Sequence, residues 1–168
     1  RLSKILIEAK KKDIITVLDL VSNNDPSFQK VVLSALPNTD YLLLNEIEAE
    51  LLFKRSIINS NKKLNKKLII NLSKKLLLKG IKRALIIHHA KESLYISRDE
   101  IIHTNSKTID KKKIINSVGA GDAFCAAFIY GIHESWDMKT TLKKAHAAGS
   151  AMMKVDSSSG NLPNIQKL

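Results

Sequence analysis

Apolar residues along this chain form short continuous runs, and these alternate with stretches in which apolar residues recur every three or four positions. The short runs are typical of strands covered on both faces, and the recurring spacing is typical of amphipathic helices. Residues 14–20 are the clearest run, because they are β-branched and mostly apolar. Strands are predicted over residues 14–20, 41–44, 84–88, 93–97 and 101–104.

Helices are predicted between most of these strands. Asp25 and Pro26 provide the cap and first-turn residues of one helix, Asn45 is suited to cap another, and Gly80 ends the longest amphipathic segment. Two more helices are predicted at about 122–134 and 138–153. The apolar positions that define the first four helices are Leu2, Ile5, Leu6 and Ala9; Phe28, Val31, Val32 and Ala35; Ile47, Leu51 and Leu52; and Leu64, Leu68, Leu72 and Leu76.

This alternation of helices with buried strands indicates a mostly parallel α/β sheet. A chain of 168 residues with 44% hydrophobic side chains suits one packed domain over residues 1–168. In parallel sheets, ligands gather at the carboxyl ends of the strands. Asn45 follows one predicted strand, and segment 116–122 follows Ile114 and Ile115. We therefore expect both at the ligand-binding edge of the sheet.

Residues 116–122, with the sequence Asn-Ser-Val-Gly-Ala-Gly-Asp, carry the strongest chemical signal in the chain. Gly119 and Gly121 allow a tight turn that exposes successive amide groups, and the small apolar run behind them predicts a buried helix that begins near Asp122. Exposed amides at the start of a helix form an anion hole that suits a phosphoryl group. Asp122 is open to two interpretations, a helix-capping residue or a general base beside the anion hole.

The formal net charge of +12 does not by itself indicate a nucleic-acid partner. Only 4 of the 28 basic residues are arginine, and aromatic side chains that stack on bases are sparse. The lysine clusters, including Lys111 to Lys113, are therefore interpreted as solvated faces. No stretch approaches the roughly 20 apolar residues of a membrane span, so no membrane partner is expected. The single cysteine, Cys125, is expected to be an inert core thiol of a cytoplasmic protein.

Two motifs together resemble one known family. The segment from Asn116 to Phe124 resembles the D-T-x-G-A-G-D-x-F signature of the ribokinase-like, or PfkB, carbohydrate kinases, and Asn45 to Glu48 resembles the N-x-x-E element of the same family. This resemblance implies a three-layer α/β/α fold with a mostly parallel sheet. It also implies ATP-dependent phosphorylation of a hydroxymethyl group on a sugar or a nucleoside.

Within segment 116–122, the resemblance implies a role for each residue of the glycine turn. Asp122 would be the general base that accepts the hydroxyl proton. The amides of Gly119, Ala120 and Gly121 would hold the charge of the transferring phosphoryl group. Asn116 stands where the family has an aspartate, so a negative charge on the cation side of the site is lost.

Outside that segment, the resemblance assigns the nucleotide and its metal ion. Glu48 would bind or orient Mg²⁺, mainly through water, and Asn45 would help to place the nucleotide phosphates. The alternative for this pair is a helix cap and a surface carboxylate. The purine would lie near the small face of the helix around Ala147 and Ala148. A monovalent cation is an open candidate beside ATP and Mg²⁺.

A second departure from the family lies at residues 88–93. His88, Ala90 and Ser93 stand where the family usually has the threonine and glycines of T-x-G-x-x-G. Those glycines would let the backbone approach the nucleotide, so the Cβ atoms of Ala90 and Ser93 are expected to strain or displace this nucleotide-binding loop.

Nothing in residues 1–168 corresponds to the N-terminal part of the family, which carries most of the sugar-binding residues and a lid. The chain is therefore expected to be the C-terminal, nucleotide-binding portion of a longer kinase, poorly active alone, with any homodimer formed through the missing lid. A sugar acceptor is favoured over a nucleoside because sugars are the commoner substrates in the family. The alternative is a truncated or degenerate relative that serves as a non-catalytic binding or regulatory module.

Overall fold

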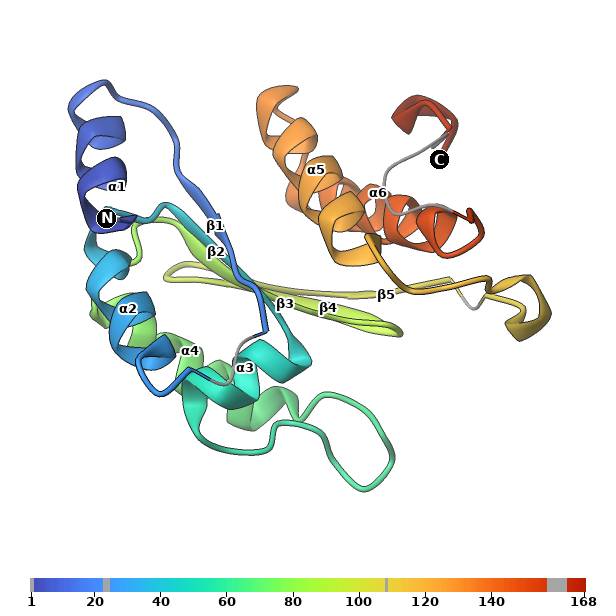
Figure 1. The fold of residues 1–168 in the computed structure, drawn as a ribbon, viewed down its shortest axis with the longest axis horizontal. Coiled ribbons are helices and arrows are strands. Elements are labelled where there is room, and N and C mark those ends of the chain that lie inside the picture. Colours follow the sequence, from blue (N-terminus) through green and yellow to red (C-terminus); the bar gives the residue numbers. More distant parts are fainter. Residues whose placement is uncertain (1, 23–24, 108, 157–162) are drawn as a thin grey trace. The chain divides into compact units, whose positions relative to one another are not determined.

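A computed structural model describes residues 2–22, 25–107, 109–156 and 163–168 (Figure 1). The chain forms two compact units. Unit 1 comprises Arg1–His89 and Leu94–Ile102, and unit 2 comprises Ala90–Ser93 and His103–Leu168. The single domain expected over residues 1–168 stays a prediction.

The strands in the described part of the chain form one sheet with the order β1-β2-β3-β4-β5. β1 pairs with β2 and β2 with β3 in parallel, and Leu18, Leu42 and Leu85 lie opposite one another. Short turns join β3 to β4 and β4 to β5. All five predicted strands are present, although β1 is shorter than predicted. Their bounds are β1 Val17–Asp19, β2 Tyr41–Asn45, β3 Ala84–His89, β4 Glu92–Ser97 and β5 Ile101–Asn105.

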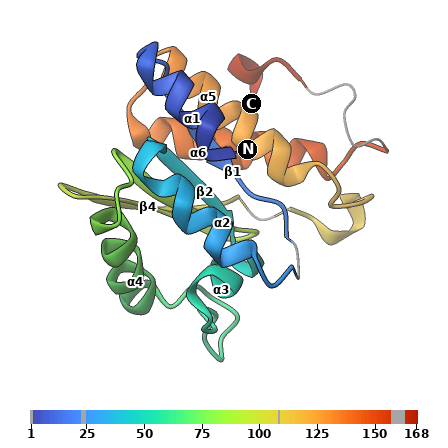
Figure 2. The ribbon, with the colours of Figure 1, turned by 60° about the vertical axis from the view of Figure 1, so that its left-hand side comes forward.

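Four helices of unit 1 pack on one face of these strands. Successive side chains of a strand point to opposite faces, and Leu42, Leu44, Leu85 and Ile87 share one core with side chains from all four helices. Leu43 and Ile86, which point to the opposite face, are also fully buried. Figure 2 shows α1, α2 and α3 in succession from blue to teal. The helices are α1 Leu2–Lys11, α2 Phe28–Ala35, α3 Glu46–Phe53 and α4 Lys66–Leu78, and a 3-10 turn, Leu36–Asn38, follows α2.

Two of these helices differ from their prediction in detail. α2 begins at Phe28 because Ser27 is its cap, and Asp25 instead accepts a hydrogen bond of 2.7 Å from the Ser27 amide. The prediction that Asp25 and Pro26 start the helix is therefore wrong by about two residues. In α4 the buried side chains are Ile69, Ser73, Leu76 and Leu77, so the buried stripe is rotated from the predicted leucines.

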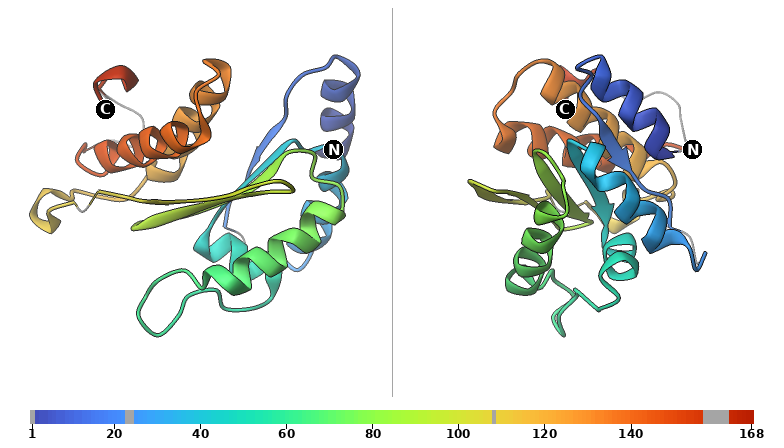
Figure 3. Two further views of the ribbon diagram at one scale, coloured as in Figure 1. Left: turned by 180° about the vertical axis from the view of Figure 1, so that it is seen from behind. Right: turned by 90° about the vertical axis from the view of Figure 1, so that its left-hand side faces the viewer.

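Unit 2 is built around two helices, α5 Ala120–His133 and α6 Met138–Met152, which lie against each other (Figures 1 and 3). Glycines allow the close approach at both ends of this pair. A Cβ atom at Gly131 would lie 2.6 Å from the Thr141 methyl carbon, and one at Gly149 would lie 3.0 Å from the Ala120 carbonyl oxygen. The helices are therefore antiparallel, and the end of α6 packs beside the start of α5. Two 3-10 turns, Lys111–Lys113 and Ile165–Lys167, complete the unit.

Along the described residues, none of the helices combines the length and the apolar character that crossing a membrane requires.

Candidate functional site

In unit 1, polar residues lie at the carboxyl ends of three neighbouring parallel strands. Asp19 ends β1, Asn45 ends β2, and His88 lies opposite Asn45 in β3. Carboxyl ends of parallel strands share one edge of the sheet, so these residues belong to the edge at which such folds bind ligands. The predicted position of Asn45 at a strand end is confirmed.

Asn45 and Glu48 close the start of α3 with a reciprocal capping box. The Asn45 side-chain oxygen accepts a hydrogen bond of 2.9 Å from the Glu48 amide, and Glu48 Oε2 accepts one of 2.9 Å from the Asn45 amide. Glu48 Oε1 accepts a further bond of 3.2 Å from the Ser22 hydroxyl. The helix-cap interpretation of Asn45 is therefore confirmed.

Glu48 itself is buried, with only 3% of its surface exposed, so its interpretation as a surface carboxylate is wrong. Burial raises the pKa of Glu48; hydrogen bonds from Asn45 and Ser22 oppose this shift, and the negative charge of Asp19 reinforces it. Asp19 and Ser22 were not among the predicted site residues. Asp19 had a visible signal, a carboxylate at the end of a buried strand, whereas nothing in the sequence distinguished Ser22.

In unit 2, the glycine turn opens directly into α5. Gly119 is the N-cap, with a φ of 76° in the left-handed region that favours glycine, and the helix begins at Ala120. The helix therefore starts two residues earlier than predicted. The prediction that the turn follows a strand is wrong: β5 ends at Asn105, and a 3-10 turn and an irregular segment lead from it to Asn116.

No side chain caps the start of α5, in contrast to α3. The Ala120 amide makes a long bond of 3.3 Å to the Ser117 carbonyl, and Ala123 bonds Gly119. Among the described residues, the amides of Gly121 and Asp122 have no hydrogen-bond acceptor, and no donor bonds the Asp122 carboxylate. Gly121 and Asp122 are both exposed. The turn thus presents free amide donors and one exposed carboxylate side by side.

Asn116 fixes this turn to the end of α6. Its side-chain oxygen accepts a bond of 2.9 Å from the Val118 amide, and its side-chain nitrogen donates one of 3.0 Å to the Val155 carbonyl. The neighbouring Ile115 amide bonds the Met153 carbonyl at 2.9 Å. An ionised aspartate at position 116 has no proton to donate to Val155, so the asparagine matches the local hydrogen bonding of this chain.

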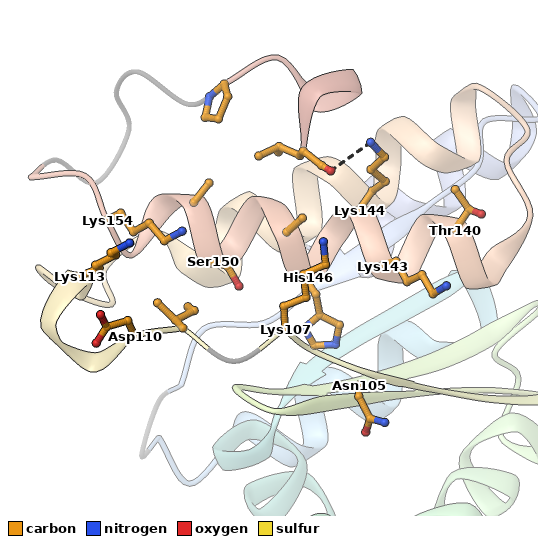
Figure 4. A pocket seen from close by; sticks show the side chains of 15 residues that line it. Asn105, Lys107, Asp110, Lys113, Thr140, Lys143, Lys144, His146, Ser150 and Lys154 are labelled. Atoms are coloured by element: carbon orange, nitrogen blue, oxygen red, sulfur yellow. Dashed lines mark hydrogen bonds between the residues drawn. The ribbon is translucent and has the colours of Figure 1, made fainter.

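A cavity of about 1070 Å³ lies in unit 2, between one side of α6 and the segment that follows β5 (Figure 4). Lysines dominate its polar lining, and Lys113 and Lys154 lie close to Asp110 at one end. Lys113, which was interpreted as part of a solvated face, is exposed and also lines this cavity. The lysines that line it are Lys107, Lys113, Lys143, Lys144 and Lys154.

The two alanines predicted at the purine site lie in different environments. Ala147 lines the cavity together with Ala151. Ala148 is buried, with 4% exposure, and faces away from open space. Successive residues of a helix point about 100° apart, so the two side chains do not share one face. The expected space for a flat ring is therefore supported at Ala147 and not at Ala148.

Residues 88–93 comprise the end of β3, a two-residue turn at Ala90 and Lys91, and the start of β4. Ser93 is fully buried, and its hydroxyl lies 2.7 Å from the Thr104 hydroxyl. Among the described residues, those with positive φ include neither Ala90 nor Ser93. The backbone strain predicted for these two residues is therefore not found, because both sit in ordinary strand and turn geometry.

Two further predictions concern Cys125 and a possible metal site. Cys125 is only partly buried, so it is not the core thiol that was expected. The described residues contain no cluster of three or more histidine, cysteine or acidic side chains suited to hold a metal ion.

The predicted site residues fall into two groups. Asn45, Glu48 and His88 lie in unit 1 at the carboxyl ends of the strands. Asn116, the glycine turn, Ala147 and Ala148 lie in unit 2 around α5 and α6. In unit 1, Asn45 bonds Glu48 and lies opposite His88. In unit 2, Asn116 bonds the glycine turn at the Val118 amide.

The fold has close counterparts among solved structures. The ribokinase of Arabidopsis thaliana, solved with ribose and ATP, aligns with a TM-score of 0.73 and 21% identity over 94% of this chain and 47% of that chain. The fold is therefore the predicted ribokinase-like α/β/α fold. The family model of the pfkB carbohydrate kinases matches residues 2–165. The chain belongs to the pfkB family of carbohydrate kinases.

Two relatives have known activities. The D-tagatose-1-phosphate kinase of Bacillus licheniformis is 33% identical over 150 residues, which is 89% of this chain and 43% of that protein. The 5-dehydro-2-deoxygluconokinase of Clostridium perfringens is 38% identical over 56 residues, which is 33% of this chain and 17% of that protein. The chain thus spans less than half the length of these relatives.

Proposed function

We propose that this chain forms the phosphoryl-transfer part of an ATP-dependent sugar kinase. The observation that carries the proposal is the start of α5, where free amides and the exposed Asp122 carboxylate lie in one turn. Membership of the pfkB family supports the same reaction, and the relatives with known activities are sugar kinases.

In the proposed reaction, Asp122 accepts the proton of the acceptor hydroxyl as its oxygen attacks the terminal phosphorus of ATP. The bond from that phosphorus to the bridging oxygen breaks, and ADP leaves with the bonding electron pair. The amides of Gly119, Ala120 and Gly121 donate hydrogen bonds to the oxygens of the transferring group, whose charge the start of α5 favours. The free Asp122 amide lies in the same turn and joins this set.

The remaining roles concern the nucleotide and its cation. Asn45 helps to place the phosphates, and Glu48 orients Mg²⁺ through water. Both Glu48 oxygens already accept hydrogen bonds, which fits indirect contact with a cation that keeps much of its water shell. Bound Mg²⁺ would neutralise phosphate charge during transfer. A monovalent cation stays an open candidate.

The lysine-lined cavity beside α6 is the proposed nucleotide site of unit 2. Ala147 and Ala151 offer an apolar surface for a purine, and Lys113 and Lys154 supply positive charge for phosphates. His88 in unit 1 takes the family's threonine position in the same proposal. The acceptor is proposed to be a small sugar or sugar phosphate, with a nucleoside as the second choice. Nucleic acid is not proposed as a partner.

The test is phosphorylation by this chain joined to the part of a pfkB kinase that it does not span. We expect ATP and Mg²⁺ to raise the melting temperature, and a panel of sugars, sugar phosphates and nucleosides to contain an acceptor. Asp122→Asn should lower turnover by about 10²–10⁴-fold while nucleotide affinity stays nearly unchanged, because only proton transfer is lost. Equal turnover of that variant would remove Asp122 from the mechanism.

A non-catalytic regulatory module is the second candidate. The observations that favour it are the exchanges at His88, Ala90, Ser93 and Asn116, two of which are built into ordinary hydrogen bonding of this chain. The discriminating result is nucleotide binding without phosphate transfer across the whole acceptor panel. The cytoplasmic location and the homodimer through a lid belong to the kinase proposal and stay predictions.

A further inference from the structure

The side chains that line the cavity of unit 2 carry an excess of positive charge. Five of them are lysines, and among the lining residues that the structure describes Asp110 is the single acidic one. Asp110 lies near Lys113 and Lys154 (Figure 4), yet the ion pairs within the described part of the chain include neither lysine. Such a lining favours a ligand with several negative charges.

One lysine of the lining already has a structural role. Lys144 Nζ donates hydrogen bonds of 3.2 Å to the backbone carbonyls of Ile165, Gln166 and Leu168. It therefore fixes the 3-10 turn 165–167 beside α6, and its charge is partly used by the protein itself. The charge that remains for a ligand comes from the other lysines of the lining.

Lys113 and Lys154 lie at the end of the cavity that leads to the glycine turn. The Asn116 side chain bonds the Val155 carbonyl at 3.0 Å and so joins the segment before the turn to the segment after α6. Lys113 precedes Asn116 by three residues, and Lys154 directly precedes Val155. A triphosphate that runs from the cavity toward the amides of the turn therefore passes these two lysines.

The size and the charge of the cavity together select the form of the ligand. Its volume of about 1070 Å³ is just above the range of about 300–1,000 Å³ typical of small-molecule pockets, so a purine and its phosphates have room. Free ATP carries about four negative charges at neutral pH, and one Mg²⁺ ion cancels about half of this charge. A lysine-rich lining attracts the free form more strongly than the magnesium complex.

We infer that the cavity of unit 2 binds metal-free ATP more tightly than its magnesium complex, and that Lys113 and Lys154 set this preference. The inference rests on the proposed function, because the cavity is its proposed nucleotide site. Metal-free ATP lacks the cation that neutralises phosphate charge during transfer, so it occupies the site without reacting. The ratio of Mg²⁺ to ATP therefore regulates the site.

The test measures ATP binding to the full chain by isothermal titration calorimetry, once in excess EDTA and once in excess Mg²⁺. We expect a dissociation constant about fivefold lower in EDTA. Lys113→Met and Lys154→Met should each raise the constant for free ATP by about fivefold and that for the magnesium complex by less. Inorganic triphosphate should compete more weakly than ATP, because it cannot use the apolar surface of Ala147 and Ala151.

Lys112→Met is the matched control, because Lys112 neighbours Lys113, is likewise exposed and does not belong to the described lining. It should leave both dissociation constants unchanged. The side chains of Lys112, Lys113 and Lys154 are all exposed, so none of the three variants should change the melting temperature of the chain without ligand.

Three results overturn the inference: ATP that binds no more tightly in EDTA than with Mg²⁺, an equal loss with Lys112→Met, or inorganic triphosphate that binds as tightly as ATP. A preference for metal-free ATP without phosphate transfer by the joined kinase leaves the inference standing and counts against the proposed function alone. Phosphate transfer by a kinase whose cavity prefers the magnesium complex has the opposite meaning.

Discussion

The starts of α3 and α5 are both at predicted site residues, but they are built in opposite ways. At α3, Asn45 and Glu48 satisfy each other's amides, and the carboxylate is buried. At α5, a glycine takes the cap position and the amides of Gly121 and Asp122 stay free. A helix start closed by its own side chains stabilises the fold, whereas one left open can bind an anion. The predictions below test this contrast.

The largest effect on stability is expected from disrupting the capping box at the start of α3. Glu48→Ala leaves the part-buried Asn45 amide without its acceptor, which should lower the free energy of unfolding by about 1–3 kcal/mol. Glu48→Gln keeps an oxygen that can accept from Asn45, so its cost should be clearly smaller. Chemical denaturation of both variants measures the difference. Equal losses would show that the capping box does not stabilise α3.

At the open start, the two glycines should respond with opposite signs. Gly119→Ala places a Cβ atom on a residue with positive φ and should lower the free energy of unfolding by about 1–2 kcal/mol. Gly121 lies within the helix, so Gly121→Ala should leave stability unchanged or raise it by a few tenths of a kcal/mol. Thermal unfolding of the pair is the measurement. A destabilised Gly121→Ala variant would contradict the helical start at Ala120.

Asn116→Asp tests the hydrogen bonds that join the glycine turn to the segment after α6. The carboxylate still accepts from the Val118 amide but cannot donate to the Val155 carbonyl, so we expect a loss of about 0.5–1.5 kcal/mol. Faster amide exchange over residues 116–119 should accompany the loss, because the turn is then released from the end of α6. Asn116→Ala is the control, since it removes both bonds and should cost at least as much. An unchanged Asn116→Asp variant would argue against the contact with Val155.

The smallest effect is expected in the dependence of stability on pH. Burial raises the pKa of Glu48 above its ordinary 4.5, so the folded state holds this proton longer than the unfolded state does. Its contribution to stability is therefore present at low pH and is lost as pH rises through the folded pKa. Glu48→Gln has no carboxyl group to titrate at this position. Its free energy of unfolding relative to the wild type should therefore increase as pH rises above 4.5.

Asp40 provides the opposite case in the same unit. Burial acts to raise its pKa, but hydrogen bonds from Thr16 and Lys10 outweigh burial and lower the pKa below 3.8. Its contribution is present above 3.8 and is lost as pH falls through the folded pKa. Urea unfolding from pH 3 to pH 7 should therefore show opposite trends for Asp40→Asn and Glu48→Gln relative to the wild type. Parallel trends would contradict the burial of Glu48.

Much of the fold could be predicted because its signals are local. The capping box joins Asn45 to Glu48 across three residues, so the sequence alone indicated it, and the strands and helices followed from apolar spacing. The glycine turn was found for the same reason. Its exact helix start was missed by two residues, because Gly119 and Ala120 fit either a turn or a first helical residue.

The order of the elements, the parallel α/β class and the two motifs could all be predicted from the amino-acid sequence, because each depends on neighbours within a few positions. The burial of Glu48 beside Asp19 could not, and neither could the hydrogen bond from Asn116 to Val155, 39 residues further along the chain. The structure likewise shows that Ile14 and Ile15 are exposed, although the predicted strand over residues 14–20 indicated burial. Burial and contacts between distant residues depend on how the elements pack, and the local spacing of apolar residues does not specify that packing.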